Sequence, residues 1–250
     1  MKQILIIVLI GLTITSCKNN SIKQVESIST SNKVTVGYLN MVSSLTHFVA
    51  LEKGYYTEQN LEVRGNSIKT SDLIAQDLVA GHINVGIELA ITPVLKQLEI
   101  APNSIKIFST SNITTDNGFD AILVNNSSLI RKLEDLSGKK VGGFPGTTAK
   151  VSFLELFKTK HPKLPPPEFI KLSPDQHIQS LLIGDIDALF AYEPILSTGM
   201  IKYNFREIFP SVYGAQFSPN PIGVGAVNQQ WLKENHEIAK AFFIAIDKAV

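Results

Sequence analysis

Cys17 is the only cysteine in the 250 residues, and it stands where a lipid anchor would be attached. A cationic start at Lys2 is followed by an apolar run from Ile4 to Leu12 and by small residues directly before the thiol. This order is typical of a secretory signal peptide and its cleavage site. A cysteine directly after the small residues indicates a lipobox, in which the thiol receives a diacylglycerol. We therefore expect residues 1–16 to be a signal peptide and Cys17 to be the lipidation site.

The alternative for this N-terminal segment is a membrane-spanning helix. Such a helix needs about 20 apolar residues, and the run before Cys17 is too short for that. Residues 17–32 are rich in Ser, Asn and Lys without an apolar period, so we expect a flexible tether between the lipid and the folded body. The predicted protein is exported and is anchored by its lipid to the outer face of the cell membrane or in the periplasm.

Two carboxylates, Glu88 and Glu193, each stand at the end of a predicted strand in corresponding positions. Two carboxylates in one cleft would favour a ligand with amine or amidine donors. No activated nucleophile accompanies the pair, and we therefore expect no catalytic residue and no enzymatic activity.

Hydroxyl and amide side chains occupy further predicted loop positions. Gly146, Thr147 and Thr148 open a predicted helix, where free backbone N–H groups and the helix dipole would bind an anionic or carbonyl group. The threonines can also serve only as caps of that helix. The other candidates of this kind are Ser43 and Ser44, which pose the same choice before another helix, and Asn40 and Asn112, which are suited to fixing the orientation of a ligand.

Aromatic and cationic residues complete the set of candidates. Tyr38 and Tyr192 can stack on a planar ligand, although aromatic residues beside strand ends more often belong to a core. Of the five histidines only His47 falls near the predicted cleft, and none has the spacing of metal ligands, so we expect no metal and no other cofactor. Arg64 can supply a bidentate contact to an anionic ligand, or it can be a solvated loop charge.

The balance of charge argues against nucleic acid as a partner. The chain has 23 basic and 22 acidic side chains, and removal of the signal peptide takes away Lys2 and leaves a neutral body. A nucleic-acid-binding domain would carry a basic surface instead. We expect a monomer whose partner in the cleft is a small molecule.

Short apolar strands alternate with amphipathic helices from Lys33 onward. The order of strand and helix indicates an α/β fold with parallel-dominated sheets covered by helices. Ligands of such sheets bind beyond the carboxyl ends of the strands, where the candidate residues fall. Strands are expected at residues 34–39, 61–63, 83–87, 105–109, 119–124, 140–144, 169–172, 186–192 and 222–227, and helices at about 44–54, 72–81, 91–98, 129–133, 147–160, 175–183 and 231–250.

The two halves of this series resemble each other in sequence. The residues around Gly81 match those around Gly184, since each stretch is a helix end, a turn glycine and a buried strand. Val36-Gly37 corresponds in the same way to Val141-Gly142. This similarity predicts two equivalent lobes joined by crossing strands.

Four ordered motifs carry a resemblance to a known family. They are Glu52–Val63, Ala80–Gly86, Asp135–Gly142 and Leu182–Ala188, the last of which runs into Tyr192-Glu193-Pro194. Their order and spacing resemble the solute-binding lipoproteins of ABC importers, which have the periplasmic-binding-protein type II fold. Within that family they are similar to the branch that serves sulfonates, taurine, nitrate and thiamine-pyrimidine precursors. The Tyr-Glu-Pro step recurs widely in the family, so the resemblance implies that Glu193 can bind a backbone group instead of a ligand.

The resemblance implies two lobes that close on a ligand in a central cleft around two hinge strands, here residues 119–124 and 222–227. Residues 33–118 with 222–250 are expected to form the first lobe, and residues 119–221 the second. Chains of this family usually continue with further helices. Because the sequence stops inside an apolar pattern without a helix C-cap, we expect C-terminal helices beyond Val250.

The resemblance and the lipobox together predict the solute-binding component of an ABC import system, which delivers a small organic molecule to a membrane permease. Two alternatives stay open, an enzyme on the same fold that acts on a pyrimidine or menaquinone precursor, and a ligand-sensing lipoprotein. The pyrimidine synthases of this fold carry a cysteine-rich motif that is absent here. The ligand's charge is also left open, because the two glutamates favour an amine-bearing heterocycle and Arg64 with the helix N-termini favours a sulfonate, nitrate or carboxylate.

Overall fold

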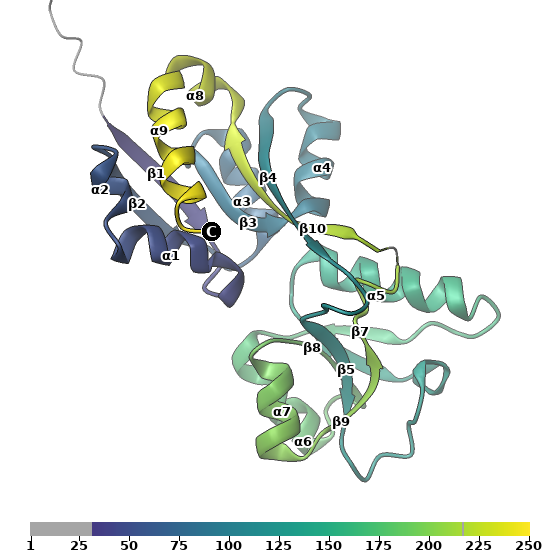
Figure 1. The fold of residues 1–250 in the computed structure, drawn as a ribbon. Coiled ribbons are helices and arrows are strands. Elements are labelled where there is room, and N and C mark those ends of the chain that lie inside the picture. Colours follow the sequence, from purple (N-terminus) through teal and green to yellow (C-terminus); the bar gives the residue numbers. More distant parts are fainter. Residues whose placement is uncertain (1–31, 217) are drawn as a thin grey trace, which may run out of the picture. The chain divides into compact units, whose positions relative to one another are not determined.

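The computed structural model describes residues 32–216 and 218–250. The predicted signal peptide, the lipidation site Cys17 and the predicted tether up to residue 31 lie outside the described residues. Residues 32–250 form one compact unit, and within it the chain folds into two lobes, each built on a five-stranded sheet (Figure 1). No helix in the described part is both long and apolar enough to span a membrane.

The first lobe contains the strands β1 (Lys33–Tyr38), β2 (Glu62–Ser67), β3 (Val85–Ala90), β4 (Ile105–Ile113) and β10 (Asn220–Asn228). Their order in the sheet is β2-β1-β3-β10-β4. β1 pairs in parallel with β2 and β3, whereas β10 runs antiparallel to β3 and β4. The sheet is therefore mixed, with a parallel half and an antiparallel half.

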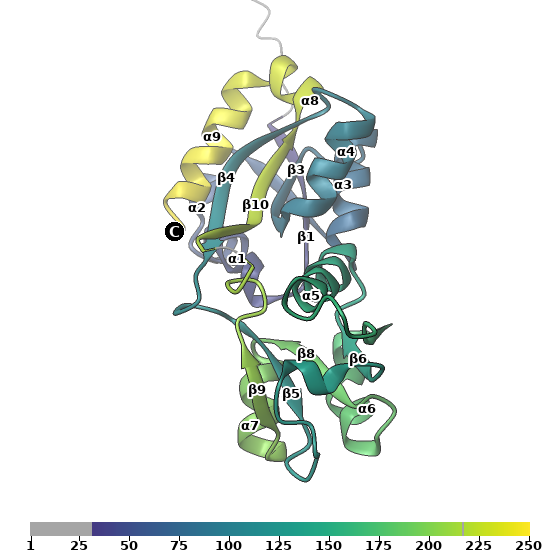
Figure 2. The ribbon, with the colours of Figure 1, turned by 90° about the vertical axis from the view of Figure 1, so that its right-hand side faces the viewer.

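Helices cover both faces of the first sheet (Figure 2). They are α1 (Leu45–Glu52), α2 (Tyr55–Glu58), α3 (Ser71–Ala80), α4 (Ile91–Ile100), α8 (Gln229–Glu234) and α9 (His236–Asp247). On one face α2 and α9 contribute Tyr56 and Phe242 to a buried cluster with Val36 of β1. On the other face α3 and α4 contribute Ile74 and Val94 to a second cluster. The apolar residues that recur with helical spacing in the sequence form the faces with which these helices pack on the sheet.

The second lobe contains the strands β5 (Asp120–Val124), β6 (Lys140–Gly143), β7 (Glu168–Lys171), β8 (Ala188–Tyr192) and β9 (Arg206–Pro210). Their order is β7-β6-β8-β5-β9, with β6 parallel to β7 and β8, and β5 antiparallel to β8 and β9. Helix α5 (Thr147–Lys160) packs on one face through Phe153 and Phe157. Helices α6 (His177–Ile183) and α7 (Ile195–Tyr203) pack on the other through Leu181 and Leu196.

The two sheets have the same topology, so the similarity of the two halves of the sequence is also a similarity of structure. Gly81 and Gly184 both end a helix in the left-handed region, with φ of 74° and 80°. Gly37 and Gly142 occupy equivalent tight positions, because a Cβ on either would lie 2.5 Å from the Cδ1 of an isoleucine, Ile83 or Ile186. The predicted two-lobe α/β fold is confirmed, and each lobe follows one plan.

Gly142→Ala is expected to destabilise the protein by about 1–3 kcal/mol, the usual cost of overpacking a core. The new methyl group would meet Ile186 at 2.5 Å and Leu172 at 2.8 Å, and Ile186 is 2% exposed and has little room to move. Denaturant unfolding monitored by circular dichroism measures the loss. Gly146→Ala is the control, since its methyl group meets nothing closer than 3.6 Å. Equal stability of the two variants would contradict the packing argument.

The chain crosses between the lobes in the segment between β4 and β5 and again between β9 and β10. Among the described residues, β5 pairs only with β8 and β9, and β10 only with β3 and β4. Each of the two strands expected to act as a hinge therefore belongs to the sheet of one lobe. The two crossing segments contact each other. The Ser211 hydroxyl donates to the Thr114 carbonyl at 3.4 Å, and the Ser211 N–H donates to the Asp120 carbonyl at 2.8 Å.

Several elements differ from the sequence expectation. Helix α7 and strand β9 were not expected, because Pro194 directly before α7 and Gly199 within it are residues typical of loops. In the structure Gly199 lies against Phe205 and Leu123, where a Cβ would approach their side chains to 2.9 and 3.1 Å, so this glycine permits close packing of α7. The helix expected at residues 231–250 is interrupted at Asn235, between α8 and α9.

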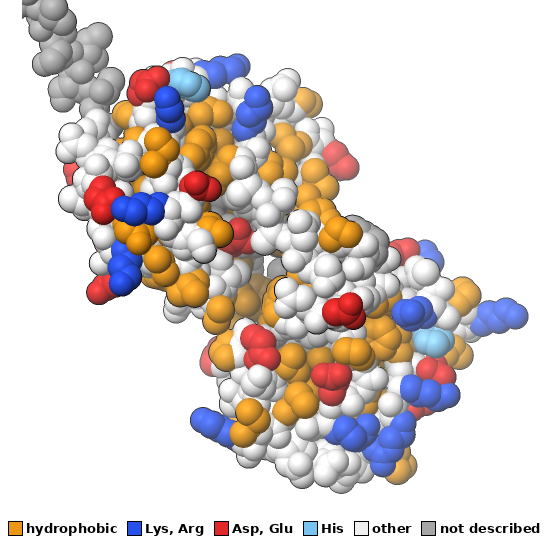
Figure 3. All heavy atoms as spheres, viewed as in Figure 1, with side chains coloured by type: hydrophobic (Ala, Val, Ile, Leu, Met, Phe, Trp, Pro, Cys, Tyr) orange, Lys and Arg blue, Asp and Glu red, His pale blue; other side chains and the backbone are white. Residues whose placement is uncertain are grey.

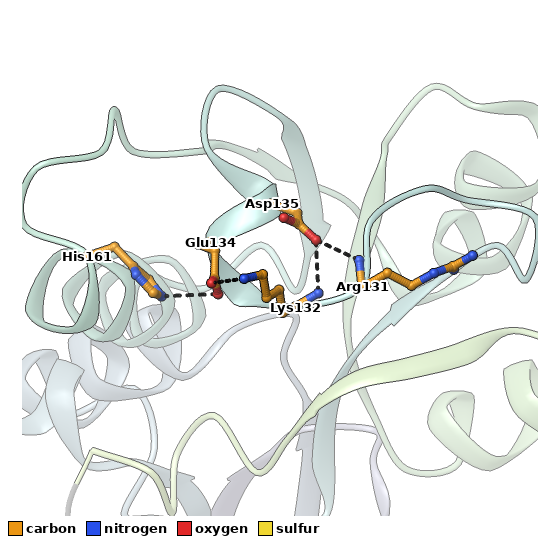
Figure 4. A network of polar contacts seen from close by, with 5 residues as sticks. All are labelled: Arg131, Lys132, Glu134, Asp135 and His161. Carbon is orange, nitrogen blue, oxygen red and sulfur yellow. Dashed lines mark hydrogen bonds and ion pairs between the residues drawn. The ribbon is translucent and has the colours of Figure 1, made fainter.

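A further difference lies in the loop before β6, where the helix expected at residues 129–133 is replaced by a 3-10 turn, η2 (Leu133–Leu136). Asp135 accepts the backbone N–H groups of Arg131 at 2.8 Å and Lys132 at 3.2 Å (Figure 4). The first of these bonds is the main reason that the pKa of Asp135 is lowered. Glu134 pairs with Lys132 at 2.5 Å and lies 3.9 Å from His161. This network fixes the chain's entry into β6.

Candidate functional site

A cavity of about 980 Å³ lies between the two lobes. Its walls come from the turn after β1, from β3, β4 and β10, from the N-termini of α3 and α5, from the end of β8 and from α9. The volume is in the range of sites for small organic ligands. In the space-filling view the surface is hollowed between the lobes and acidic side chains lie beside the hollow (Figure 3).

Glu88 projects into this cavity from β3 with an unusual backbone, a φ of 49°. The Ser111 hydroxyl of β4 donates to Glu88 Oε2 at 2.5 Å. Gly223 of β10 leaves the room for this pair, because a Cβ there would lie 2.3 Å from Ser111 Oγ and 2.7 Å from Glu88 Oε2. Burial raises the pKa of Glu88, and the Ser111 hydrogen bond partly opposes that shift. Glu88 Oε1 has no hydrogen-bond partner in the described part of the chain, so the carboxyl group has an oxygen to offer to a ligand.

Glu193 also lines the cavity, directly after β8, but both of its oxygens have partners. Oε1 accepts the Ser197 hydroxyl at 2.7 Å, and Oε2 accepts the Ser197 backbone N–H at 3.1 Å. Ser197 lies in the first turn of α7, whose N–H groups have no intrahelical acceptor. The sequence left two roles open for Glu193, contact with a ligand or a bond to a backbone group. In the structure Glu193 bonds to the backbone N–H of Ser197.

The N-terminus of α5 meets a carboxylate from the other lobe. Asp72, in the first turn of α3, accepts the Thr147 backbone N–H at 3.0 Å through Oδ2 and the Thr147 hydroxyl through Oδ1. Gly146 and Thr148 line the cavity beside this contact, while Thr147 is turned to Asp72. The Thr148 hydroxyl is buried and has no hydrogen-bond partner among the described residues.

Aromatic side chains form the walls on both sides of the cavity. Tyr192 and Tyr213 share a hydrogen bond of 2.5 Å between their hydroxyl groups, and Phe119 lies edge-on to Tyr192 with ring centroids 5.6 Å apart. On the first lobe Phe108 and Phe243 pack together at 4.6 Å. Such walls suit a ligand with a planar or apolar body.

A buried carboxyl group, Asp120, lies behind the tyrosine pair at the start of β5. It accepts the backbone N–H of Tyr213 at 3.3 Å through Oδ2, while Oδ1 has no partner among the described residues. Burial raises the pKa of Asp120 to about 6, against the opposing effect of the backbone bonds to Tyr213 and Val212. Asp120 therefore ties the second crossing segment to the first strand of the second lobe.

The structure brings together seven of the twelve residues proposed from the sequence. Tyr38, Asn40, Ser44, His47 and Thr147 do not line the cavity, and neither does Arg64. The seven that do line it are Ser43, Glu88, Asn112, Gly146, Thr148, Tyr192 and Glu193.

His47 belongs to the interior of the first lobe. Its Nδ1 lies 2.9 Å from the Tyr56 hydroxyl, and its ring is 2% exposed. Burial lowers the pKa of His47, so the neutral ring is favoured. Gly65 permits this packing, because a Cβ there would lie 2.9 Å from Tyr38 and 3.0 Å from His47 Nε2. Tyr38 and His47 are therefore packing partners in this structure.

Several cavity residues were not anticipated, and Asp72 is the most important. The sequence offered one signal for it, an acidic residue in the first turn of a predicted helix, but that pattern is common and gives no partner. The others lie on β10 and α9 and include Gly223 and Phe243. The rule for the carboxyl ends of parallel strands does not reach them, because β10 is antiparallel to its neighbours.

In the described part of the chain, no group of three or more His, Cys, Asp or Glu side chains could hold a metal ion. The acidic groups around the cavity are Asp72, Glu88, Glu193 and Asp247, and Lys240 is the basic one. The arrangement is chemically that of a binding site, with hydrogen-bonding groups set among apolar walls.

A family model described as NMT1/THI5 like matches residues 42–250. Among curated proteins, the 4-amino-5-hydroxymethyl-2-methylpyrimidine phosphate synthases THI13 and THI5 of Saccharomyces cerevisiae are each 21% identical to the chain over 213 residues. These matches cover 81% of this chain and 61% of the relatives. The chain thus spans about three fifths of the length of the curated relatives that it matches.

Solved structures of similar fold include two binding proteins. The alkanesulfonate-binding protein SsuA from Xanthomonas axonopodis pv. citri, bound to MOPS, has a TM-score of 0.70 and 16% identity, over 87% of this chain and 73% of that one. The periplasmic nitrate-binding protein NrtA from Synechocystis PCC 6803 has a TM-score of 0.66 and 16% identity, over 88% and 61% of the two chains. At this identity the likeness establishes the two-lobe periplasmic-binding-protein fold.

Proposed function

Because the chain belongs to the NMT1/THI5-like family and places a cavity of about 980 Å³ between its two lobes, we propose that it is the solute-binding component of an ABC import system. It captures a small organic molecule in that cavity and delivers it to a membrane permease. The observation that carries the proposal is that both lobes supply walls to one cavity, so that a ligand can hold the lobes together. Ligand binding then shifts the population from open to closed states.

The lining of the cavity supports a ligand with a planar or apolar body and at least one hydrogen-bond donor. Aromatic rings from both lobes supply the apolar contacts, and Glu88 supplies an acceptor that is already positioned by Ser111. Thr148 and Asn112 add a hydroxyl and an amide. Each of these groups fixes orientation, and the apolar walls supply most of the affinity.

The proposed delivery role also rests on the N-terminal sequence. A lipid on Cys17 and a polar tether would hold the folded body at the outer face of a membrane, where it meets both solute and permease. The yeast relatives favour one alternative, an enzyme that acts on a pyrimidine precursor on the same fold, since they are named as synthases.

Isothermal titration calorimetry of residues 18–250 against a panel of amines, amino-heterocycles, sulfonates, carboxylates and nitrate tests the proposal. We expect one solute class to bind with a stoichiometry of one and to be recovered unchanged by mass spectrometry. Calorimetry is preferable to tryptophan fluorescence, because the single tryptophan, Trp231, lies on α8 and does not line the cavity. Recovery of a chemically altered solute would support the enzyme instead, and absence of binding to every class would refute solute capture.

A further inference from the structure

The N-terminus of α5 is occupied by a carboxylate of the chain itself, that of Asp72. Asp72 reaches it from the other lobe, and its two oxygens accept both the backbone N–H and the hydroxyl of Thr147. Asp72 Oδ2 would lie only 3.6 Å from a Cβ on Gly146, so the carboxylate sits directly at the start of the helix. Figure 2 shows α5 at the junction, below α3 and α4 of the first lobe.

A helix N-terminus attracts negative charge because its first N–H groups lack intrahelical acceptors and the helix dipole is positive there. Helix α5 has 14 residues, no acidic residue in its first turn and no capping side chain of its own. Asp72 therefore supplies the anion that this helix end would otherwise take from a ligand. An anionic group entering the cavity would have to displace a carboxylate that is already bonded.

The other acidic residues that line the cavity also disfavour an anionic ligand. Asp72, Glu88, Glu193 and Asp247 border the cavity, and among the described residues Lys240 is the single basic side chain in its walls. None of the chain's three arginines, all of which are described, lines the cavity. Like charges around a cleft disfavour an anionic ligand before any contact is made.

One polar group in the first turn of α5 remains available. Thr148 is 6% exposed and lines the cavity, and its hydroxyl has no partner among the described residues. A buried hydroxyl without a partner is costly, and a ligand that bonds to it removes that cost. The hydroxyl can donate or accept, so this position suits an uncharged polar group of the ligand.

We propose that Asp72 is a specificity-determining residue, which fills the anion-binding N-terminus of α5 and restricts the cavity to uncharged or cationic solutes. This inference rests on the proposed function and extends it to the charge of the ligand. It also assigns Thr148 as the contact of α5 with the ligand, because Thr147 is already bonded to Asp72.

The test uses methanesulfonate and methylammonium as small probes of opposite charge, with sodium chloride at the same ionic strength as the reference. In Asp72→Ala the N-terminus of α5 is free, and we expect a saturating concentration of methanesulfonate to raise Tm by about 3 °C more than chloride does. The unaltered protein is expected to respond to methanesulfonate by less than about 1 °C, because Asp72 already occupies the position. Methylammonium should not raise the Tm of the variant above that of the reference.

Asp77→Ala is the matched control, because Asp77 lies on the same helix but bonds to the exposed His82 instead of to the other lobe. Asp72→Ser is a second variant that leaves the anion position open if Asp72→Ala does not fold. An equal response of the unaltered protein and both Asp72 variants would overturn the inference, as would no response above chloride in a folded variant.

The calorimetric panel separates this inference from the proposed function. If a sulfonate or carboxylate binds in the unaltered cavity more tightly than the corresponding amine, solute capture stands and the role of Asp72 falls. If no solute binds, the proposal of solute capture fails. A response of Asp72→Ala to methanesulfonate would still show that Asp72 occupies the anion-binding N-terminus of α5.

Discussion

Replacing Glu88 by glutamine is expected to weaken binding of the captured solute by about 10- to 100-fold, which corresponds to the roughly 1.5–3 kcal/mol of a hydrogen bond to a charged group. The amide has nearly the same shape, so the cavity keeps its volume and its aromatic walls. It lacks the negative charge, and one of its two polar atoms donates where a carboxylate accepts. Calorimetric titration with the solute identified in the panel measures the loss.

Glu99→Gln is the matched control for this experiment. Glu99 is exposed near the end of α4 and does not line the cavity, so its replacement should leave the affinity unchanged. Glu88→Gln should also leave the unfolding transition close to that of the unaltered protein, because Glu88 is only partly buried. An unchanged affinity in Glu88→Gln would mean that this carboxylate does not contact the solute.

Asp120→Asn is expected to remove a loss of stability that the unaltered protein suffers as the pH rises from 4 to 7. The pKa of Asp120 is about 6 in the folded protein, raised by burial from its ordinary value of 3.8. Between these two values the folded state holds a proton that the unfolded state has released, so stability falls with rising pH. A pKa shift of this size corresponds to about 3 kcal/mol of unfolding free energy. All of it is lost once the pH is well above 6.

The groups around Asp120 do not offset this loss. Tyr192 and Tyr213 face it, and burial raises the pKa of both hydroxyl groups far above neutrality, so they stay uncharged.

The two buried histidines, His47 and His177, change the stability with pH in the opposite direction. Burial lowers the pKa of each, and their contribution to stability grows as the pH rises through 6.5. Only a comparison of variants therefore isolates the part due to Asp120.

Denaturant unfolding at pH 4, 5, 6, 7 and 8 measures this difference. The curve of Asp120→Asn should lie above that of the unaltered protein by an amount that grows up to about pH 7, and the two should approach each other near pH 4. Asp116→Asn, an exposed neighbour, is the control and should follow the unaltered protein. Parallel curves for Asp120→Asn and the unaltered protein would show that Asp120 is ionised without cost.

The fold could be predicted from the sequence because its signals are local and repeated. Turn glycines such as Gly81 and Gly184 end helices, and apolar runs directly after them form the central strands β3 and β8. Helix α7 and strand β9, which were not expected, depend on tertiary contacts. Gly199 reads as a loop residue in sequence, but it lets α7 approach Phe205 and Leu123.

Part of the set of candidate residues lines the cavity, and the candidates that do not line it have a common physical cause. The rule of strand ends selected Glu88, Thr148 and Tyr192, which line the cavity in the structure. It could not foresee that Thr147 would be bonded to Asp72, 75 residues earlier in the chain. Nor could it distinguish Glu88, which keeps a free oxygen, from Glu193, whose oxygens both bond to Ser197. Partners distant in sequence decide which polar groups are left for a ligand.

Hydrogen exchange measured by mass spectrometry, with and without the identified solute, tests the central claim most directly. If a ligand is held between the lobes, amide protection should increase in both of them, around β3 and β10 in the first and around the N-terminus of α5 and the end of β8 in the second. The solute should bind once per chain and leave unchanged. Protection confined to one lobe, or none at all with a bound solute, would contradict capture between the lobes.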